Sequence, residues 1–222
     1  MQSMIGNITL NISFVLYLTL CIPQTVHNLI HKNTSGLSLL MYLIFCTSWI
    51  ADLMYGFGNH MQWQYRMVTL TGLFFLSIQF VQLGMYRKIT YRYFLLGLYL
   101  LSFLIFSITA VSVFAMSRVF YDAMGVVAEV SGFLYMLPQI YKNFKIKSVE
   151  SLSLFFILID VISSFCDSIT AWTLHWDYPS RFGEPFVFTF GVILLLQFVF
   201  YKPKTYLTSS GCLHSSRQQG PQ

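Results

Sequence analysis

The sequence has little charge. Only 9% of its 222 residues are Asp, Glu, Lys or Arg, and 56% are hydrophobic. An ordinary soluble domain carries about 25% charged residues, and a soluble chain of this length has no way to hide so much apolar surface from water. The composition therefore excludes an ordinary soluble domain and favours a protein embedded in a membrane.

Cysteine pairs and cofactor motifs are also missing. Three of the four cysteines lie inside apolar runs, so we expect no extracellular disulfide bond. No phosphate-binding loop or glycine-rich dinucleotide motif is present, and His27 and His31 lack the intervening glutamate of a zinc protease. We therefore expect no cofactor, no metal site and no enzymatic activity. The cysteines are Cys21, Cys46, Cys166 and Cys212.

Seven apolar runs of spanning length follow one another along the chain. A helix needs about 20 residues to cross the hydrocarbon, and its backbone groups must be satisfied within the segment. We therefore predict an all-α integral membrane protein with seven transmembrane helices. The runs are approximately Ile5–Leu29, Leu37–Tyr55, Val68–Tyr86, Tyr93–Phe114, Tyr121–Tyr141, Leu152–Leu174 and Phe182–Tyr201.

The net charge of +5 is distributed unevenly between the connections. The first, third and fifth connections and the C-terminal tail hold ten Lys and Arg residues, whereas the other connections hold three. Positive residues accumulate on the cytoplasmic side, so the N-terminus is predicted outside or in a lumen and the C-terminus in the cytoplasm. The charge thus reports topology, and we expect no nucleic-acid partner.

A repeat without gaps divides the chain. Residues 23–52 and 138–167 are related by a shift of 115, and eleven of the 30 positions are identical. Shared hydrophobicity explains matched leucines, but not polar residues and prolines in register. The repeated pairs include Pro23/Pro138, Gln24/Gln139, Asn28/Asn143, Lys32/Lys147, Leu37/Leu152, Ser38/Ser153, Leu39/Leu154 and Asp52/Asp167.

The repeat predicts a 3+1+3 architecture. Residues 5–86 form one three-helix bundle, residues 121–202 form the other, and a linker helix at 93–114 gives both the same orientation. Transporters with parallel repeats bind their substrate near the midplane between the halves. The remainder, 205–222, is rich in Ser, Gly and Gln and is expected to be a disordered cytosolic tail.

Each half carries a Pro-Gln pair in the last third of its first helix. Proline removes one backbone hydrogen bond and bends a helix. Gln24 and Gln139 can refill the freed carbonyl group or bind across helices. Pro23 and Pro138 are therefore either static kinks or hinges, and their presence in both halves favours hinges.

Acidic residues at membrane depth are candidates for function. Each costs about 2.5–3.5 kcal/mol on insertion scales, so such residues face a cavity or a partner. Asp52 and Asp167 repeat in both halves, which fits structural hydrogen bonding and gating equally well. Asp160 and Glu129 break the symmetry, and Phe45 is the counterpart of Asp160. Because burial opposes ionisation of a carboxyl group, we expect these two to load and release protons.

Aromatic residues complete the candidate binding site. Trp49, Tyr135 and Tyr141 lie within or at the end of expected spans and are able to line a pocket with Asp52, Asp160 and Asp167. Packing and interface positions are the alternative for aromatic residues in a span.

The paired Pro-Gln motifs resemble the PQ-loop family of seven-helix proteins, which includes cystinosin-like transporters and is related in fold to the SWEET proteins. The resemblance covers about residues 10–204 and is greatest in PQIYKNFKIKSVESLSLFFILID and RFGEPFVFTFGVILLLQFVFYK. It implies that Asp160 is the proton-coupling aspartate. Tyr135, Phe156 and Gly191 stand where cystinosin-like members carry Lys, Asn and Asp, which argues against cystine.

These observations predict a secondary active transporter for an amino acid or similar metabolite, coupled to protons by alternating access. The alternative is a non-transporting receptor or sensor that binds a ligand in the same cavity. The expected partners are the solute, protons and the lipid bilayer, and the oligomeric state is left open. A plasma membrane, bacterial ones included, and an endolysosomal membrane both fit.

Overall fold

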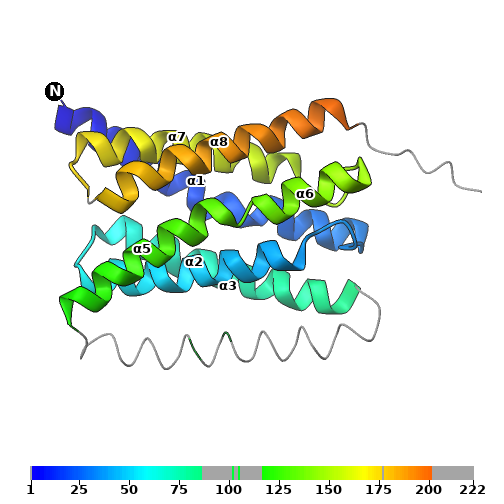
Figure 1. The fold of residues 1–222 in the computed structure, drawn as a ribbon, viewed down its shortest axis with the longest axis horizontal. Coiled ribbons are helices and arrows are strands. Elements are labelled where there is room, and N and C mark those ends of the chain that lie inside the picture. Colours follow the sequence, from blue (N-terminus) through cyan, green and yellow to red (C-terminus); the bar gives the residue numbers. More distant parts are fainter. Residues whose placement is uncertain (1, 87–101, 103–104, 106–116, 177, 202–222) are drawn as a thin grey trace, which may run out of the picture.

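The computed structural model describes residues 2–86, 102, 105, 117–176 and 178–201. Nearly all of the expected linker helix at 93–114, and the expected tail at 205–222, lie outside the described residues. Six described segments are long and apolar enough to cross a membrane, with α5 and α6 counted together. The helices in Figure 1 are α1 (Gln2–His31), α2 (Leu39–Gly58), α3 (Trp63–Tyr86), α5 (Arg118–Leu134), α6 (Leu137–Ile146), α7 (Leu154–Thr173) and α8 (Tyr178–Phe200).

The two halves pack in equivalent ways. Helix α3 lies against both α1 and α2, and α8 lies against α7 and against α5 and α6. Among the described helices, α1 and α2 do not contact each other, nor do α5 and α7. The third helix of each half therefore lies between the other two. The halves meet where α1 packs on α7 and α2 packs on α5.

The helix ends are equivalent in the two halves. The Ser38 hydroxyl caps α2 by accepting from the Met41 amide, and Ser153 caps α7 in the same way. Helix α6 ends at Lys147, whose φ of 52° is left-handed, and its counterpart Lys32 follows α1 with a φ of 47°. Serine is a favoured N-cap, and a left-handed residue often ends a helix. The same local rules thus build both halves.

The first helices of the two halves differ at proline. Helix α1 is continuous through Pro23, whereas the expected single span Tyr121–Tyr141 is broken between Leu134 and Leu137. Pro138 lies in the first turn of α6 and has no N–H for the Leu134 carbonyl group. Arg118–Ile146 therefore remains one spanning segment, as expected, and its kink is a break of two residues just before Pro138.

The first helix of each half, α1 and α5 with α6, ends at the same end of the molecule as α3 and α8. The ends of α1, α3, α6 and α8 gather at the right of Figure 1, which we call the PQ end. The opposite end, where α2 and α7 finish, is called the acidic end. The main apolar core lies toward the PQ end and midspan, and a small cluster of Leu10, Ala171 and Trp176 lies at the acidic end.

Candidate functional site

A cavity lies between the two halves, from midspan to the acidic end. It is lined by side chains of α1, α2, α3, α5, α7 and α8. Its volume is about 100 Å³, measured over the positions that the centre of a water molecule can take. One water needs roughly 10–15 Å³ on that measure, so this central cavity has room for several waters or a small solute.

Two repeat pairs line the central cavity at midspan. Leu20 corresponds to Tyr135, and Phe45 corresponds to Asp160. The Tyr135 ring stacks on Phe45 with centroids 4.4 Å apart. The Tyr135 hydroxyl lies 3.1 Å from both carboxylate oxygens of Asp160 and donates to them. The second half thus supplies a polar pair where the first half supplies Leu20 and Phe45.

Asp160 is the most deeply placed carboxyl group of the cavity. Its side chain is only 2% exposed and comes from the middle of α7. The one hydrogen-bond partner of its carboxylate among the described residues is the neutral Tyr135 hydroxyl. A buried carboxylate without a cationic partner is costly to keep ionised.

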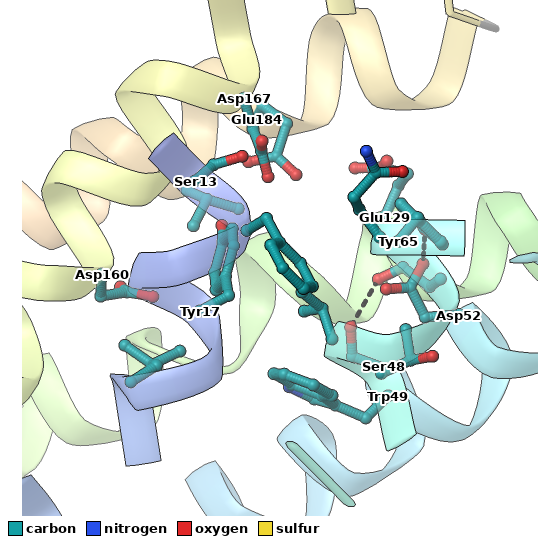
Figure 2. A pocket seen from close by; sticks show the side chains of 18 of the residues that line it. Ser13, Tyr17, Ser48, Trp49, Asp52, Tyr65, Glu129, Asp160, Asp167 and Glu184 are labelled. Carbon is teal, nitrogen blue, oxygen red and sulfur yellow. Dashed lines mark hydrogen bonds between the residues drawn. The ribbon is translucent and has the colours of Figure 1, made fainter. Parts of the chain in front are cut away.

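The repeated acids Asp52 and Asp167 lie closer to the acidic end. Asp52 on α2 accepts a hydrogen bond from the Tyr65 hydroxyl on α3. Asp167 on α7 lies beside the side chains of Ser13 and Tyr17 on α1. In Figure 2, Asp52 and Asp167 lie on different sides of the cavity. Tyr17 lies between Asp160 and Asp52 in this view. Each repeated acid thus faces neutral donors.

Two glutamates complete the acidic lining. Glu129 on α5 lies against α8, and its Oε2 atom occupies the space beside Gly183, where a Cβ atom would lie 1.8 Å from it. Glu184 on α8 lies near Asp167 in Figure 2, and its Oε2 atom is buried without a hydrogen-bond partner in the described part of the chain. Sequence reasoning missed Glu184.

The repeat contained a signal for Glu184. A shift of 115 places it opposite Thr69, and both residues line the central cavity. The same shift relates Glu129 to Phe14, which also lines the cavity. Many of the positions that line the cavity therefore come in pairs. A search for acids at the counterparts of cavity positions would have added Glu184 to the candidates.

The two aromatic candidates outside the midspan group have different positions. Trp49 lines the central cavity, and its ring occupies the space beside Gly72, where a Cβ atom would lie 1.6 Å from it. Tyr141 is 66% exposed on α6 and is not among the lining residues. The helix break before Pro138 places Tyr141 toward the PQ end. The structure thus places Tyr141 outside the central cavity.

Gln24 reaches across to the other half at the PQ end. Its Nε2 donates to the Ser151 carbonyl oxygen at 3.1 Å, and its Oε1 accepts from the Ser153 backbone N–H at 2.8 Å. The Nε2 also donates to Asn28 Oδ1 at 2.8 Å. Of the two roles expected for this glutamine, bonding across helices is the one found. Ser153 is the N-cap of α7, so the first half holds the start of a second-half helix.

Gln139 makes the corresponding set of bonds in the opposite direction. It donates to the Gly36 carbonyl oxygen at 3.1 Å and to Asn143 Oδ1 at 2.7 Å, and it accepts from the Ser38 backbone N–H at 2.7 Å. We call the two sets the Gln clamps. Because Gln24 and Gln139 are at most 1% exposed, these bonds are protected from water. Together the clamps join the two halves at the PQ end.

Each Gln clamp is supported by the third helix of its own half. Asn28 donates to Gln82 at 3.0 Å, and Asn143 donates to Gln197 at 2.9 Å. Gln82 in turn donates to the Thr25 carbonyl oxygen at 3.0 Å. Amide side chains have both donors and acceptors, so such a network can satisfy every buried group. The Pro-Gln motif is therefore one part of a network that spans both halves.

The helices and the cavity define an integral membrane protein built from a repeated helical unit. The family model of the PQ loop repeat matches residues 5–65 and 120–180, which is more than half of the chain. The chain therefore belongs to the PQ-loop repeat family.

A eukaryotic SWEET transporter, solved at 3.7 Å resolution, has a similar structure with a TM-score of 0.68. The match covers 90% of this chain and 98% of that one, at 18% sequence identity. At this identity the likeness concerns the fold. A comparison with curated proteins found no match.

Proposed function

We propose that this protein is a secondary transporter that moves a small solute, an amino acid or similar metabolite, by proton-coupled alternating access. Membership of the PQ-loop repeat family and the SWEET-like fold support transport of small solutes. The observation that carries the proton coupling is Asp160, buried at midspan in the central cavity with only a neutral hydroxyl partner.

The position of Asp160 suits a coupling role. An ionised carboxylate inside a membrane is costly, so the group must be hydrated, paired or protonated. When the cavity is open to solution, water can hydrate the carboxylate. When the cavity closes around its solute, a proton on Asp160 removes the charge, and Tyr135 remains as a hydrogen-bond partner. Proton binding thus favours the closed form through which the solute passes.

Passage to the PQ end requires the Gln clamps to open. Four of their hydrogen bonds join one half to the other, two at Gln24 and two at Gln139. The break between α5 and α6 lies directly beside Tyr135. Movement of α6 at this break would therefore change the Tyr135–Asp160 contact and the clamp at Gln139 together. This links the proton site to the closure of the PQ end.

Liposomes containing the purified protein test the proposal. Wild type is expected to accumulate a solute, found by screening amino acids and related metabolites, when a pH gradient is imposed. Asp160→Asn keeps the size and hydrogen bonding of protonated Asp but has no proton to exchange. It is expected to equilibrate the solute without concentrating it.

The matched control is Glu150→Gln, which neutralises an exposed acid at the PQ end. It is expected to behave as wild type. Accumulation by Asp160→Asn at the wild-type level would reject Asp160 as the coupling site and would make Glu129 the next candidate. Binding of the solute without any flux would instead support the receptor alternative.

A further inference from the structure

A glutamine of α3 bonds α1 on both sides of its proline. The Gln79 Nε2 atom donates to the Cys21 carbonyl oxygen at 2.9 Å and to the Thr25 hydroxyl oxygen at 3.1 Å. The Thr25 hydroxyl in turn donates to the Cys21 carbonyl oxygen at 2.8 Å. Cys21 precedes Pro23 by two residues, and Thr25 follows it by two. We call these three bonds the α3 bridge, because they join α1 to itself and to α3 across the proline.

The α3 bridge compensates for what the proline removes. Pro23 has no N–H group, and its ring crowds the preceding turn of the helix. A membrane helix tolerates a proline where a neighbouring helix or a Ser or Thr side chain bonds the backbone groups that the proline disturbs. Gln79 is 1% exposed and Thr25 is 7% exposed, so these bonds are protected from water. The bridge thus accounts for the continuity of α1 through Pro23.

In the second half, apolar side chains replace the two that form the bridge. A shift of 115 places Leu194 at the position of Gln79 and Ile140 at the position of Thr25. Leu194 is as buried as Gln79, at 1% exposed, but it has no amide group to donate. The corresponding helix is broken between α5 and α6. The helix is therefore continuous in the half that has the bridge and broken in the other.

A second glutamine of the third helix is the same in both halves. Gln82 and Gln197 are repeat counterparts, three residues after Gln79 and Leu194. Gln82 donates to the Thr25 carbonyl oxygen, and Gln197 donates to the Ile140 carbonyl oxygen, both at 3.0 Å. The third helix thus holds the segment after the proline equally in both halves. The difference between the halves lies in the contact across the proline.

We infer that Gln79 and Thr25 lock the first half at its proline, so that the PQ end opens at the joint between α5 and α6. This inference rests on the alternating access of the proposed function and names the residues that decide where the movement occurs. Gln79 and Thr25 are positioning residues, since they act on α1 and are not among the residues that line the central cavity. In the second half, Leu194 and Ile140 leave α6 free to turn against α5.

Hydrogen exchange of backbone amides compares the two prolines without any solute. The full chain is studied in lipid nanodiscs, where residues 20–31 are expected to exchange more slowly than residues 135–146. Gln79→Leu installs the residue of the second half. It should raise exchange in 20–31 at least about fivefold and leave 135–146 unchanged, because a buried hydrogen bond is lost locally.

Ser77→Ala is the control on the same helix, because the Ser77 hydroxyl donates to the Leu73 carbonyl oxygen within α3. It should leave exchange in 20–31 at the wild-type rate. Unchanged exchange of 20–31 in Gln79→Leu would overturn the inference. An equal rise throughout the chain would also overturn it, because Gln79 would then contribute only to overall stability.

The reverse substitutions place a bridge in the second half. Leu194→Gln combined with Ile140→Thr should lower exchange in 135–146 at least about fivefold and slow solute flux in liposomes by a similar factor. Ile140→Thr alone lacks the bridging amide and is the matched control. Unchanged exchange of 135–146, or slower exchange with wild-type flux, would overturn the inference. If the double variant does not fold, the Gln79→Leu comparison decides alone.

Exchange and flux together separate this inference from the proposed function. If the expected exchange pattern is found but no solute crosses the liposome membrane, transport fails and the joint between α5 and α6 stands. If a solute is accumulated while Gln79→Leu leaves exchange in α1 unchanged, transport stands and the locking role of Gln79 fails.

Discussion

The two halves of the molecule are alike at the PQ end and different at midspan. At the PQ end, Gln24 and Gln139 make the same bonds to equivalent partners. At midspan, Leu20 and Phe45 in one half correspond to Tyr135 and Asp160 in the other. The repeated residues thus hold the halves together, and the residues that break the repeat give the cavity its chemistry.

The largest loss of stability is expected at the Gln clamps, where the two halves make equivalent bonds. Gln24→Ala and Gln139→Ala should each lower the free energy of unfolding by about 2–3 kcal/mol, because each leaves a buried N-cap amide and other polar groups unsatisfied. The two losses should agree within about 1 kcal/mol. Chemical unfolding in detergent measures both.

A suitable control for these variants is Gln62→Ala, since Gln62 is exposed between α2 and α3. It should change stability by less than about 0.5 kcal/mol. A large loss in only one of the two clamp variants would show that the halves are not held together symmetrically.

The next prediction concerns proton-driven uptake and Tyr135, at midspan, where the two halves differ. Tyr135→Phe keeps the ring stacked on Phe45 but removes the hydroxyl donor to Asp160. Hydrogen bonds to charged groups contribute about 1.5–3 kcal/mol, so proton-driven uptake should fall about tenfold or more while the fold survives. Initial uptake rates in liposomes under a fixed pH gradient measure this.

Tyr141→Phe is the matched control for Tyr135→Phe, because Tyr141 is exposed and lies outside the cavity. It should transport at the wild-type rate. Full activity of Tyr135→Phe would mean that Asp160 acts without its hydroxyl partner.

A smaller effect should separate the two prolines. Pro138→Ala restores an N–H where the chain breaks between α5 and α6, so it favours a continuous helix. It should slow exchange between the two open states by about fivefold, which corresponds to ~1 kcal/mol. Pro23→Ala should have less effect, because α1 is already continuous.

Exchange is measured by labelling single cysteines from each side of the membrane in a background without native cysteines. Equal behaviour of the two proline variants would show that the helix break does not contribute to the movement. The prolines would then be structural kinks in both halves.

The smallest effect concerns the arginines of the acidic end. Arg66→Gln removes one cation–π contact, with Phe57, and Arg181→Gln removes two, with Trp172 and Tyr178. Each such contact contributes about 0.5–1 kcal/mol, so stability should fall by no more than about 1 kcal/mol in Arg66→Gln and about 2 kcal/mol in Arg181→Gln. A sharp change in solute affinity in either variant would contradict the view that these arginines act outside the cavity.

The sequence was informative wherever a rule of local chemistry or the repeat applied. The apolar runs predicted the six spans that the structure describes. The acids expected at membrane depth, Asp52, Glu129, Asp160 and Asp167, all line the central cavity. The reach of Gln24 to Ser151 was not predictable in detail, since it depends on how the halves pack. The helix break at Tyr135 depends equally on tertiary contacts, because Pro23 in the same motif leaves α1 unbroken.

The Gln clamps have a consequence for assembly. Each half completes the first turn of a helix that belongs to the other, and it does so with the same glutamine, the same serine and the same loop carbonyl. A half on its own would have an unused glutamine and an N-cap backbone N–H without its acceptor. A chain carrying only one half would therefore be able to complete every clamp bond by pairing with a second copy of itself.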